Sequence, residues 1–180
     1  MPSPFRAFAI FMGPETPRYR EGGVDFDRQR GLRPAEGVVA AGRHLLPVRV
    51  YYEDTDFSGI VYHANYLRFL ERGRTEFLRA AGVDQSTLHA AGDGLIFAVR
   101  RLTIDYLRPA RMDDVLVVET RTAEVRGASL TIAQRILRGD EVLVTAEVRV
   151  AAILGGRPAR IPDHLRSVLA DCDGAVARSA

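Results

Sequence analysis

The sequence lacks lysine entirely, so its 25 lysine-or-arginine positions are all arginines. It also contains only one cysteine. A single cysteine, Cys172, excludes an intrachain disulfide and gives no indication of an oxidising compartment. The sequence also lacks any apolar run approaching the roughly 20 residues of a membrane-spanning helix. The apolar stretch Phe5–Met12 is short, and no clear cleavage site follows it. We therefore expect a cytoplasmic protein with no integral membrane segment.

An excess of charge of one sign is also missing. The formal net charge is +2, which is too small to indicate a nucleic-acid partner. What is present is an ordinary globular composition, with 47% hydrophobic and 27% charged residues, and this excludes disorder of the whole chain. The length of 180 residues suits one domain with a full hydrophobic core. We expect a single globular domain that does not bind nucleic acid.

Residues 1–45 differ in composition from the rest of the chain. Pro, Gly and Arg are frequent there and no apolar period is sustained, so we expect a largely disordered arm. A regular apolar pattern begins at Leu46, and we place the folded domain at residues 46–155. Residues 156–180 form a C-terminal tail, in which the segment IPDHLRSVLADC is compatible with a short helix.

One strand and one long helix open the domain. The segment PVRVYYE alternates, with Val48, Val50 and Tyr52 on one face, and this pattern predicts a strand. The stretch from Tyr62 to Ala81 predicts one long helix, which Gly82 is suited to end. The helically spaced positions are Leu67, Leu70, Arg74, Phe77, Leu78 and Ala81.

Four strand-like segments follow the helix. The first ends at Pro109, and the others span Val115–Val125, Ser129–Arg138 and Glu141–Leu154. The pair Gly139-Asp140 is typical of a two-residue hairpin turn, and short turns predict an antiparallel meander. A curved sheet must cover its apolar face, and the long helix is the available cover. We therefore predict an α+β hotdog fold, in which an antiparallel sheet wraps around a central helix. Its long edge strands favour pairing between two copies.

The acidic corner DTDFSG, residues 54–59, lies between the predicted strand and helix and resembles the start of a calcium loop. A calcium loop would take ligands from residues 54, 56 and 58, yet its twelfth position is Asn65, which cannot supply a bidentate carboxylate. A zinc site would need more than His63, and no other histidine lies near it in sequence. Neither metal is favoured.

A catalytic turn is the third interpretation of this corner. Gly59 permits a close approach of backbone or ligand, and His63 falls near the first turn of the predicted helix. Free N–H groups at the start of that helix could polarise a carbonyl oxygen, while Asp56 could activate water or attack directly. Hydrolysis of a reactive acyl derivative requires these two parts. The plainer alternative is that Asp54 and Asp56 cap the corner and the helix start.

The stretch VRVYYEDTDFSGIVYHANYLRFLERGRTEFLR closely resembles the signature of hotdog-fold acyl-CoA thioesterases of the YbgC and 4-hydroxybenzoyl-CoA thioesterase family. The resemblance continues through FAVRRLTIDYLRPARMDD and RGASLTIAQRIL and covers about residues 47–155. It implies a hydrolase that converts an acyl-CoA substrate to the free acid and CoA. It also implies that no metal or organic cofactor is needed, and that the assembly is a homodimer or homotetramer.

The resemblance further implies roles for individual residues. Asp56 takes the position of the catalytic aspartate, which acts as general base or nucleophile on the thioester. His63 takes the catalytic position at the helix start, where the backbone N–H polarises the thioester carbonyl and the imidazole is placed to contact substrate or water. Tyr52 and Gly59 match substrate-binding positions, although Tyr52 also suits the core. Asp54 is expected to be structural.

Two other function classes stay open. A non-catalytic hotdog module that binds acyl-CoA or a partner protein would not need the complete set of Asp56, Gly59 and His63. A hotdog enoyl-thioester hydratase or dehydratase would need a carboxylate on the long helix, Glu71 or Glu76, paired with a histidine on the facing element.

Overall fold

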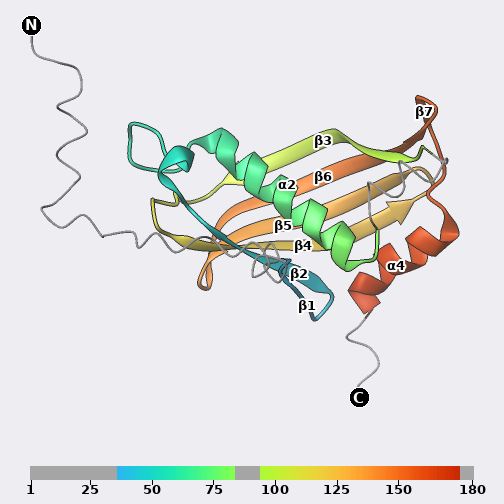
Figure 1. The fold of residues 1–180 in the computed structure, drawn as a ribbon, viewed down its shortest axis with the longest axis horizontal. Helices are drawn as coiled ribbons and strands as arrows, with labels where there is room; N and C mark the ends of the chain where they lie inside the picture. The colour runs from blue at the N-terminus through green and yellow to red at the C-terminus, as the bar shows by residue number, and fades with distance from the viewer. Residues whose placement is uncertain (1–35, 84–93, 175–180) are drawn as a thin grey trace, which may run out of the picture. The chain divides into compact units, whose positions relative to one another are not determined.

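Seven strands form one antiparallel sheet in residues 36–83 and 94–174, which are the residues that this computed structural model describes (Figure 1). The strands lie side by side in the order β1-β2-β4-β5-β6-β3, and the short β7 pairs with β6. The four long strands expected from the sequence are confirmed. The strands span β1 Val38–Ala40, β2 Arg43–Arg49, β3 Ile96–Tyr106, β4 Val115–Arg126, β5 Ser129–Arg138, β6 Glu141–Leu154 and β7 Arg157–Pro158.

The order of the strands differs from the predicted meander. Strands β4, β5 and β6 are consecutive neighbours, but β3 pairs with β6 instead of β4. Tight turns join β4 to β5 and β5 to β6, and Gly139 has φ +57° in the second turn, which confirms the predicted hairpin. Tight turns force consecutive strands to be neighbours. The longer link between β3 and β4, residues 107–114, instead passes the ends of β5 and β6.

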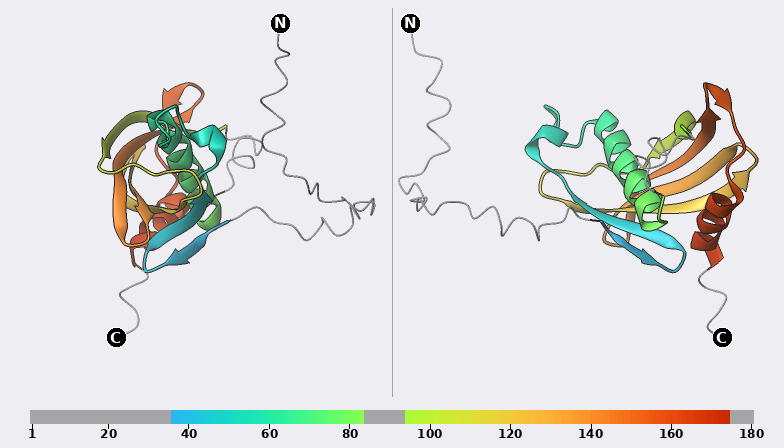
Figure 2. Two further views of the ribbon diagram at one scale, coloured as in Figure 1. Left: turned by 90° about the vertical axis from the view of Figure 1, so that its left-hand side faces the viewer. Right: turned by 45° about the vertical axis from the view of Figure 1, so that its right-hand side comes forward.

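Helix α2, His63–Ala80, packs against the sheet, which curves around it (Figure 2). The predicted stop is confirmed, because Gly82 has φ +74° just past the last turn. There the Gly82 N–H donates to the Arg79 carbonyl and the Val83 N–H donates to the Leu78 carbonyl, both at 2.8 Å. The predicted α+β arrangement, a curved antiparallel sheet around one long helix, is therefore confirmed.

The buried face of α2 is rotated slightly from the predicted one. Tyr66, Phe69, Leu70 and Phe77 are buried at helical spacing. Leu67, which was predicted on this face, is 38% exposed. The prediction for Leu67 was wrong because two aromatic side chains on the neighbouring face bury more apolar area against the sheet than a leucine can.

Two strongly polar side chains are buried between α2 and the sheet. Arg74 donates from Nη1 to Gln134 Oε1 at 2.9 Å and forms an ion pair with Glu71. Gln134 Nε2 donates to the Leu70 carbonyl at 3.0 Å and to Thr120 Oγ1 at 2.9 Å. These bonds offset the desolvation of the guanidinium and the amide. They also hold α2 in one register against β4 and β5.

The C-terminal segment contributes to the core. Helix α4, Asp163–Gly174, confirms the short helix compatible with the sequence and packs beside β4. Ile161, Leu165 and Leu169 are buried in the same apolar cluster as Phe77 of α2. The residues predicted as a tail from position 156 onward therefore include part of the hydrophobic core, and the folded region does not end at residue 155.

The sheet also begins earlier than predicted. Strands β1 and β2 pair with each other, and both start inside the segment 1–45 that was expected to be an arm. His44 of β2 is fully buried and lies opposite Thr120 of β4. The folded region therefore includes Val38 and the residues after it. Residues 1–35 lie outside the described residues, and the arm remains a prediction there.

Replacing Gly73 with alanine is expected to destabilise the fold. An added Cβ would lie 2.6 Å from Val118 Cγ1 and 3.0 Å from Thr120 Oγ1. Overpacking of this kind costs about 1–3 kcal/mol, which exceeds the gain of at most about 1 kcal/mol in helix propensity. Urea denaturation of Gly73→Ala should therefore give a lower free energy of unfolding. Arg68→Ala on the exposed face of α2 is the control, and an increase in stability for Gly73→Ala would contradict the close approach.

Candidate active site

The chain between β2 and α2 forms a tight corner. A 3-10 turn, η2 Tyr52–Asp54, leads into a hairpin. In this hairpin the Asp56 N–H donates to the Ile60 carbonyl and the Gly59 N–H donates to the Asp56 carbonyl, both at 3.0 Å. Gly59 has φ +71°, and an added Cβ would meet nothing within 4 Å. Glycine is therefore required here by the backbone conformation and not by crowding.

Asp54 and Asn65 join this corner to α2. The buried Asp54 carboxylate accepts the Tyr51 N–H at 2.8 Å. The Asp54 backbone carbonyl accepts the Tyr62 N–H and the Asn65 Nδ2–H, both at 2.9 Å. These contacts fix the corner against the first turn of the helix and agree with the structural role expected for Asp54.

Asp56 lies in the exposed part of the corner. Its Oδ1 accepts the Ser58 N–H at 2.8 Å, which ties the carboxylate to its own turn. The N-cap residue of α2 is Tyr62, and no side chain of the described residues forms a capping hydrogen bond there. The alternative that Asp54 and Asp56 cap the helix start is therefore wrong, whereas Asp54 does cap the corner.

The first backbone N–H of α2 is accordingly open. Within the described ranges, no group accepts a hydrogen bond from the His63 N–H. The first turn of α2 contains no acidic side chain. Free donors and the helix dipole make this region favourable for negative charge. Such a region suits a carbonyl oxygen that becomes an oxyanion.

The imidazole of His63 belongs to an aromatic group beside this helix start. Its ring centroid lies 4.4 Å from that of Tyr62 and 6.3 Å from that of Tyr106. Tyr106 Oη donates to the His63 carbonyl at 3.1 Å, which ties the end of β3 to the first turn of α2. A cavity of about 280 Å³ lies here, and it is lined by Ile60, Val61, His63, Tyr66, Tyr106, Leu107, Arg108 and Pro109.

Tyr66 connects this cavity to the segment that follows β3. Its Oη accepts the Ala110 N–H at 2.8 Å. Burial raises the pKa of the Tyr66 phenol, although the hydrogen bond from Ala110 acts to lower it, and burial also raises the pKa of Tyr106. Both phenols therefore keep their protons at neutral pH. Sequence analysis missed both tyrosines. Pro109 marks the end of β3 in the sequence, but nothing local shows that this end lies beside the start of α2.

Tyr52 lies elsewhere than the sequence predicted. It was placed on a strand face with Val50, but β2 ends at Arg49 and Tyr52 belongs to η2, where it is 79% exposed. The strand stops because the β2–β4 ladder breaks at Val50, whose carbonyl accepts the N–H of Asp113, a residue with φ +67°, instead of that of Asp114. The predicted strand position was therefore wrong. Tyr52 does not line the cavity beside His63, and its contact with substrate remains a prediction.

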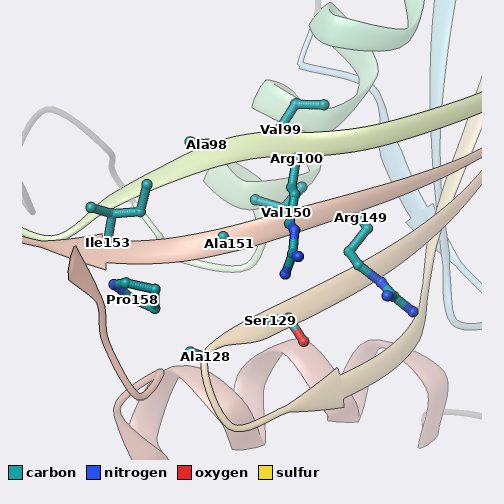
Figure 3. A pocket seen from close by; sticks show the side chains of 10 residues that line it. All are labelled: Ala98, Val99, Arg100, Ala128, Ser129, Arg149, Val150, Ala151, Ile153 and Pro158. Carbon is teal, nitrogen blue, oxygen red and sulfur yellow. The ribbon is translucent and has the colours of Figure 1, made fainter. Parts of the chain in front are cut away.

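A larger cavity than the one beside His63 lies away from this corner. It has a volume of about 600 Å³ and is formed by β3, β6, β7 and the turn before β5. Figure 3 shows Arg100, Arg149 and Ser129 beside a mainly apolar set of lining residues. Neither Asp56 nor His63 lines it, so volume alone does not identify the site of chemistry.

Two structural features relevant to function are absent from residues 36–83 and 94–174. No group of three or more His, Cys, Asp or Glu side chains there is arranged to hold a metal ion. No helix in those ranges is both long and apolar enough to cross a membrane.

Comparisons with known proteins point to one family. Residues 50–169 match the thioesterase-like superfamily. The acyl-CoA thioesterase YbgC of Haemophilus influenzae is 46% identical over 123 residues, which are 67% of this chain and 90% of that protein. The acyl-CoA thioester hydrolase YbgC of Escherichia coli is 44% identical over 122 residues, which are 66% of this chain and 90% of that protein. The crystal structure of a probable thioesterase from Bartonella henselae is 46% identical with a TM-score of 0.64, covering 67% of this chain and 99% of that one.

Replacing Asn65 tests the link between the corner and α2. Asn65→Ala removes the donor to the buried Asp54 carbonyl and should cost about 1 kcal/mol of stability. Asn65→Asp keeps the shape but sets a carboxylate against that carbonyl, so at neutral pH it should cost more. The difference between the two variants should shrink near about pH 4, where the new carboxyl gains a proton. Equal free energies of unfolding in urea for both variants at neutral pH would contradict the assigned donor.

Proposed function

Since this chain belongs to the thioesterase-like superfamily, we infer that it is an acyl-CoA thioesterase, which hydrolyses an acyl-CoA to the free carboxylic acid and CoA. Two curated relatives at 46% and 44% identity are named for this activity. The resemblance noted in the sequence, and the thioester hydrolase activity that it implied, are confirmed at this level.

We propose that the reaction takes place at the corner between β2 and α2. The observation that carries this proposal is the open start of α2, where the His63 N–H has no capping side chain and the Asp56 carboxylate lies on the preceding exposed turn. The oxygen of a thioester carbonyl placed over the helix start accepts a hydrogen bond from the His63 N–H. The Asp56 carboxylate then acts on the carbonyl carbon or on a water beside it.

Both routes for Asp56 give the same products, the free acid and CoA. As a base, Asp56 takes a proton from water while the water oxygen bonds to the carbonyl carbon. As a nucleophile, it forms a mixed anhydride that water then hydrolyses. In both routes the negative charge develops on the carbonyl oxygen near the His63 N–H, and the C–S bond breaks as the CoA thiolate leaves. A thiolate is a good leaving group, so no strong general acid is needed.

The remaining site residues take supporting roles in this proposal. Gly59 shapes the turn that carries Asp56, because its φ of +71° sets the path of the hairpin. The His63 ring, with Tyr66 and Tyr106, lines the cavity of about 280 Å³ that receives the acyl group. Tyr52 contacts the part of the substrate that lies outside this cavity, because its side chain is 79% exposed.

The two other function classes are less well supported. A hydratase or dehydratase would need Glu71 or Glu76 as its acid or base, but Glu71 forms an ion pair with Arg74 and Glu76 forms one with Arg79. A binding module would not need the open helix start beside an exposed aspartate. Formation of free thiol from an acyl-CoA, without hydration of an enoyl thioester, distinguishes the thioesterase from both.

We propose a cytoplasmic homodimer or homotetramer. Strand β3 lies at one edge of the sheet and is 11 residues long. A long edge strand is a template for pairing with another chain unless it is covered, and a second copy of β3 is a suitable cover. Light scattering on the purified chain tests this proposal, and a monomer at micromolar concentration would overturn it.

Replacing Asp56 with asparagine should remove most of the turnover and leave the fold intact. Asn retains an oxygen that can accept the Ser58 N–H, so the turn keeps its shape, but it can neither take a proton nor attack the thioester. We expect kcat to fall by about 10²–10⁴-fold. Thiol release from short, long and aromatic acyl-CoAs measures kcat. Turnover near the wild-type rate in a folded Asp56→Asn variant would contradict the proposed mechanism.

Replacing His63 with proline removes both its backbone N–H and its imidazole, whereas replacing it with alanine removes the imidazole alone. Proline is favoured at the first position of a helix, and Tyr62 has φ −59° and ψ 130°, a conformation that precedes proline readily. The variant should fold and lose about 10²–10³-fold in kcat because the oxyanion donor is gone. His63→Ala keeps the N–H and lacks the ring, so it should lose much less. A smaller loss in His63→Pro than in His63→Ala would contradict the role of the backbone N–H.

A further inference from the structure

The segment 107–114, between β3 and β4, forms one wall of the proposed site. Its first three residues line the cavity beside His63. Its middle is bonded to both sides of the site, since the Ala110 N–H donates to Tyr66 Oη at 2.8 Å and the Ala110 carbonyl accepts the Val61 N–H at 2.9 Å. Val61 belongs to the corner between β2 and α2, and Tyr66 belongs to the first turns of α2. A shift of this segment would therefore move the corner relative to the helix start.

The second half of the segment contains a residue with a positive φ and is bonded to the end of β2. Asp113 has φ +67°, which is uncommon for a residue other than glycine. Its N–H donates to the Val50 carbonyl at 3.1 Å, and the Val50 N–H donates to the Asp114 carbonyl at 2.9 Å. These two bonds tie this part of the segment to the end of β2.

Four charged side chains bind both ends of the segment to the β5–β6 hairpin. At the first end, Arg108 Nε lies 2.7 Å from Glu141 Oε1. Glu141 Oε2 in turn accepts from Arg138 Nη2 at 2.7 Å. At the other end, Arg138 Nη1 donates to Asp114 Oδ2 at 2.8 Å, and the same oxygen accepts the Arg111 N–H at 2.9 Å. We refer to Arg108, Glu141, Arg138 and Asp114 as the ionic chain.

The central pair of the ionic chain, Arg138 and Asp114, is charged at neutral pH. Desolvation acts to raise the pKa of the Asp114 carboxyl, but hydrogen bonds from the Arg111 N–H and the Arg138 guanidinium, together with the charge of Arg138, outweigh it and hold that pKa below its usual value. Hydrogen bonds to Glu141 and Asp114 raise the pKa of Arg138 further. The ion pair between Arg138 and Asp114 therefore persists at neutral pH.

We propose that Arg138 and Asp114 are positioning residues for the thioesterase. They keep segment 107–114 in place, and through Ala110 they keep the corner that carries Asp56 aligned with the open N–H of α2. This inference rests on the proposed function, because it assumes that the reaction takes place at the corner between β2 and α2. Neither residue touches the substrate.

A positioning role differs from a structural one in how much a variant loses in kcat compared with how much it loses in folding stability. Ion pairs that remain partly exposed contribute little to folding stability. The side chains of Arg138 and Asp114 are 35% and 22% exposed, so breaking their contact should leave the free energy of unfolding nearly unchanged. A displacement of about 1 Å in a catalytic group, by contrast, can lower the rate by about 10²-fold. Loss of kcat without loss of stability is therefore the signature of positioning.

The test uses Arg138→Gln, Asp114→Asn and the double variant, with Arg126→Gln as the matched control. Arg126 pairs with Glu124 on an exposed part of the sheet at the other end of β4 and β5. We expect kcat of Arg138→Gln to fall by about 10- to 100-fold with a smaller change in KM. The melting temperature should stay within about 4 °C of the wild type. The double variant should lose no more than the worse single variant, and Arg138→Lys should recover part of kcat.

The outcomes separate this inference from the proposed function. Wild type and Asp56→Asn are assayed first on the same acyl-CoA panel, and failure of that comparison concerns the proposed function alone. If wild type is active, Asp56→Asn is inactive and Arg138→Gln behaves like Arg126→Gln, the positioning role is wrong. Additive losses in the double variant would also overturn it. Should Arg138→Gln prove unstable, Asp114→Asn and Arg138→Lys give the same test, because each keeps part of the contact.

Discussion

Helix α2 approaches the sheet so closely at Gly73 that a methyl group placed there would lie 2.6 Å from Val118 Cγ1. On either side of this contact, Arg74 donates to Gln134, and Gln134 donates to the Leu70 carbonyl. The contact fixes the depth of the helix, and the two hydrogen bonds fix its rotation and its position along its axis. The open N–H at the start of α2 has a defined place beside the end of β3 because the middle of the helix cannot slide.

The parts of the fold that the sequence predicted well are those with local signals. Strands β5 and β6 were predicted to the residue, since strict alternation and the turn at Gly139-Asp140 leave little freedom. The end of α2 at Gly82 follows from the left-handed conformation that glycine permits. Asp56, Gly59 and His63 could be proposed together because one short segment contains the turn and the helix start.

The parts that sequence reasoning missed depend on contacts between distant residues. Nothing in the pattern of β3 shows that it pairs with β6, because that pairing is decided by the path of residues 107–114 past the ends of two other strands. Tyr106 approaches His63 only as a result of that pairing. Tyr52 was placed in a strand because its segment alternates, but the ladder with β4 breaks at Val50, where Asp113 replaces Asp114 as the donor to the Val50 carbonyl.

The start of α2 lacks a feature that usually stabilises the start of a helix. A Ser, Thr, Asn or Asp at the N-cap typically adds about 1 kcal/mol, yet the N-cap here is Tyr62, which forms no capping hydrogen bond through its side chain. The carboxylate of Asp56 accepts the Ser58 N–H instead. A capping side chain would bond the N–H of the second or third helical residue, and its oxygen would lie beside the region proposed to receive the thioester oxygen. The helix start is held instead from outside, by the Tyr106 hydroxyl on the His63 carbonyl and by Asn65 on the Asp54 carbonyl. These contacts stabilise the first turn without using the His63 N–H, which is the donor proposed to bind the substrate.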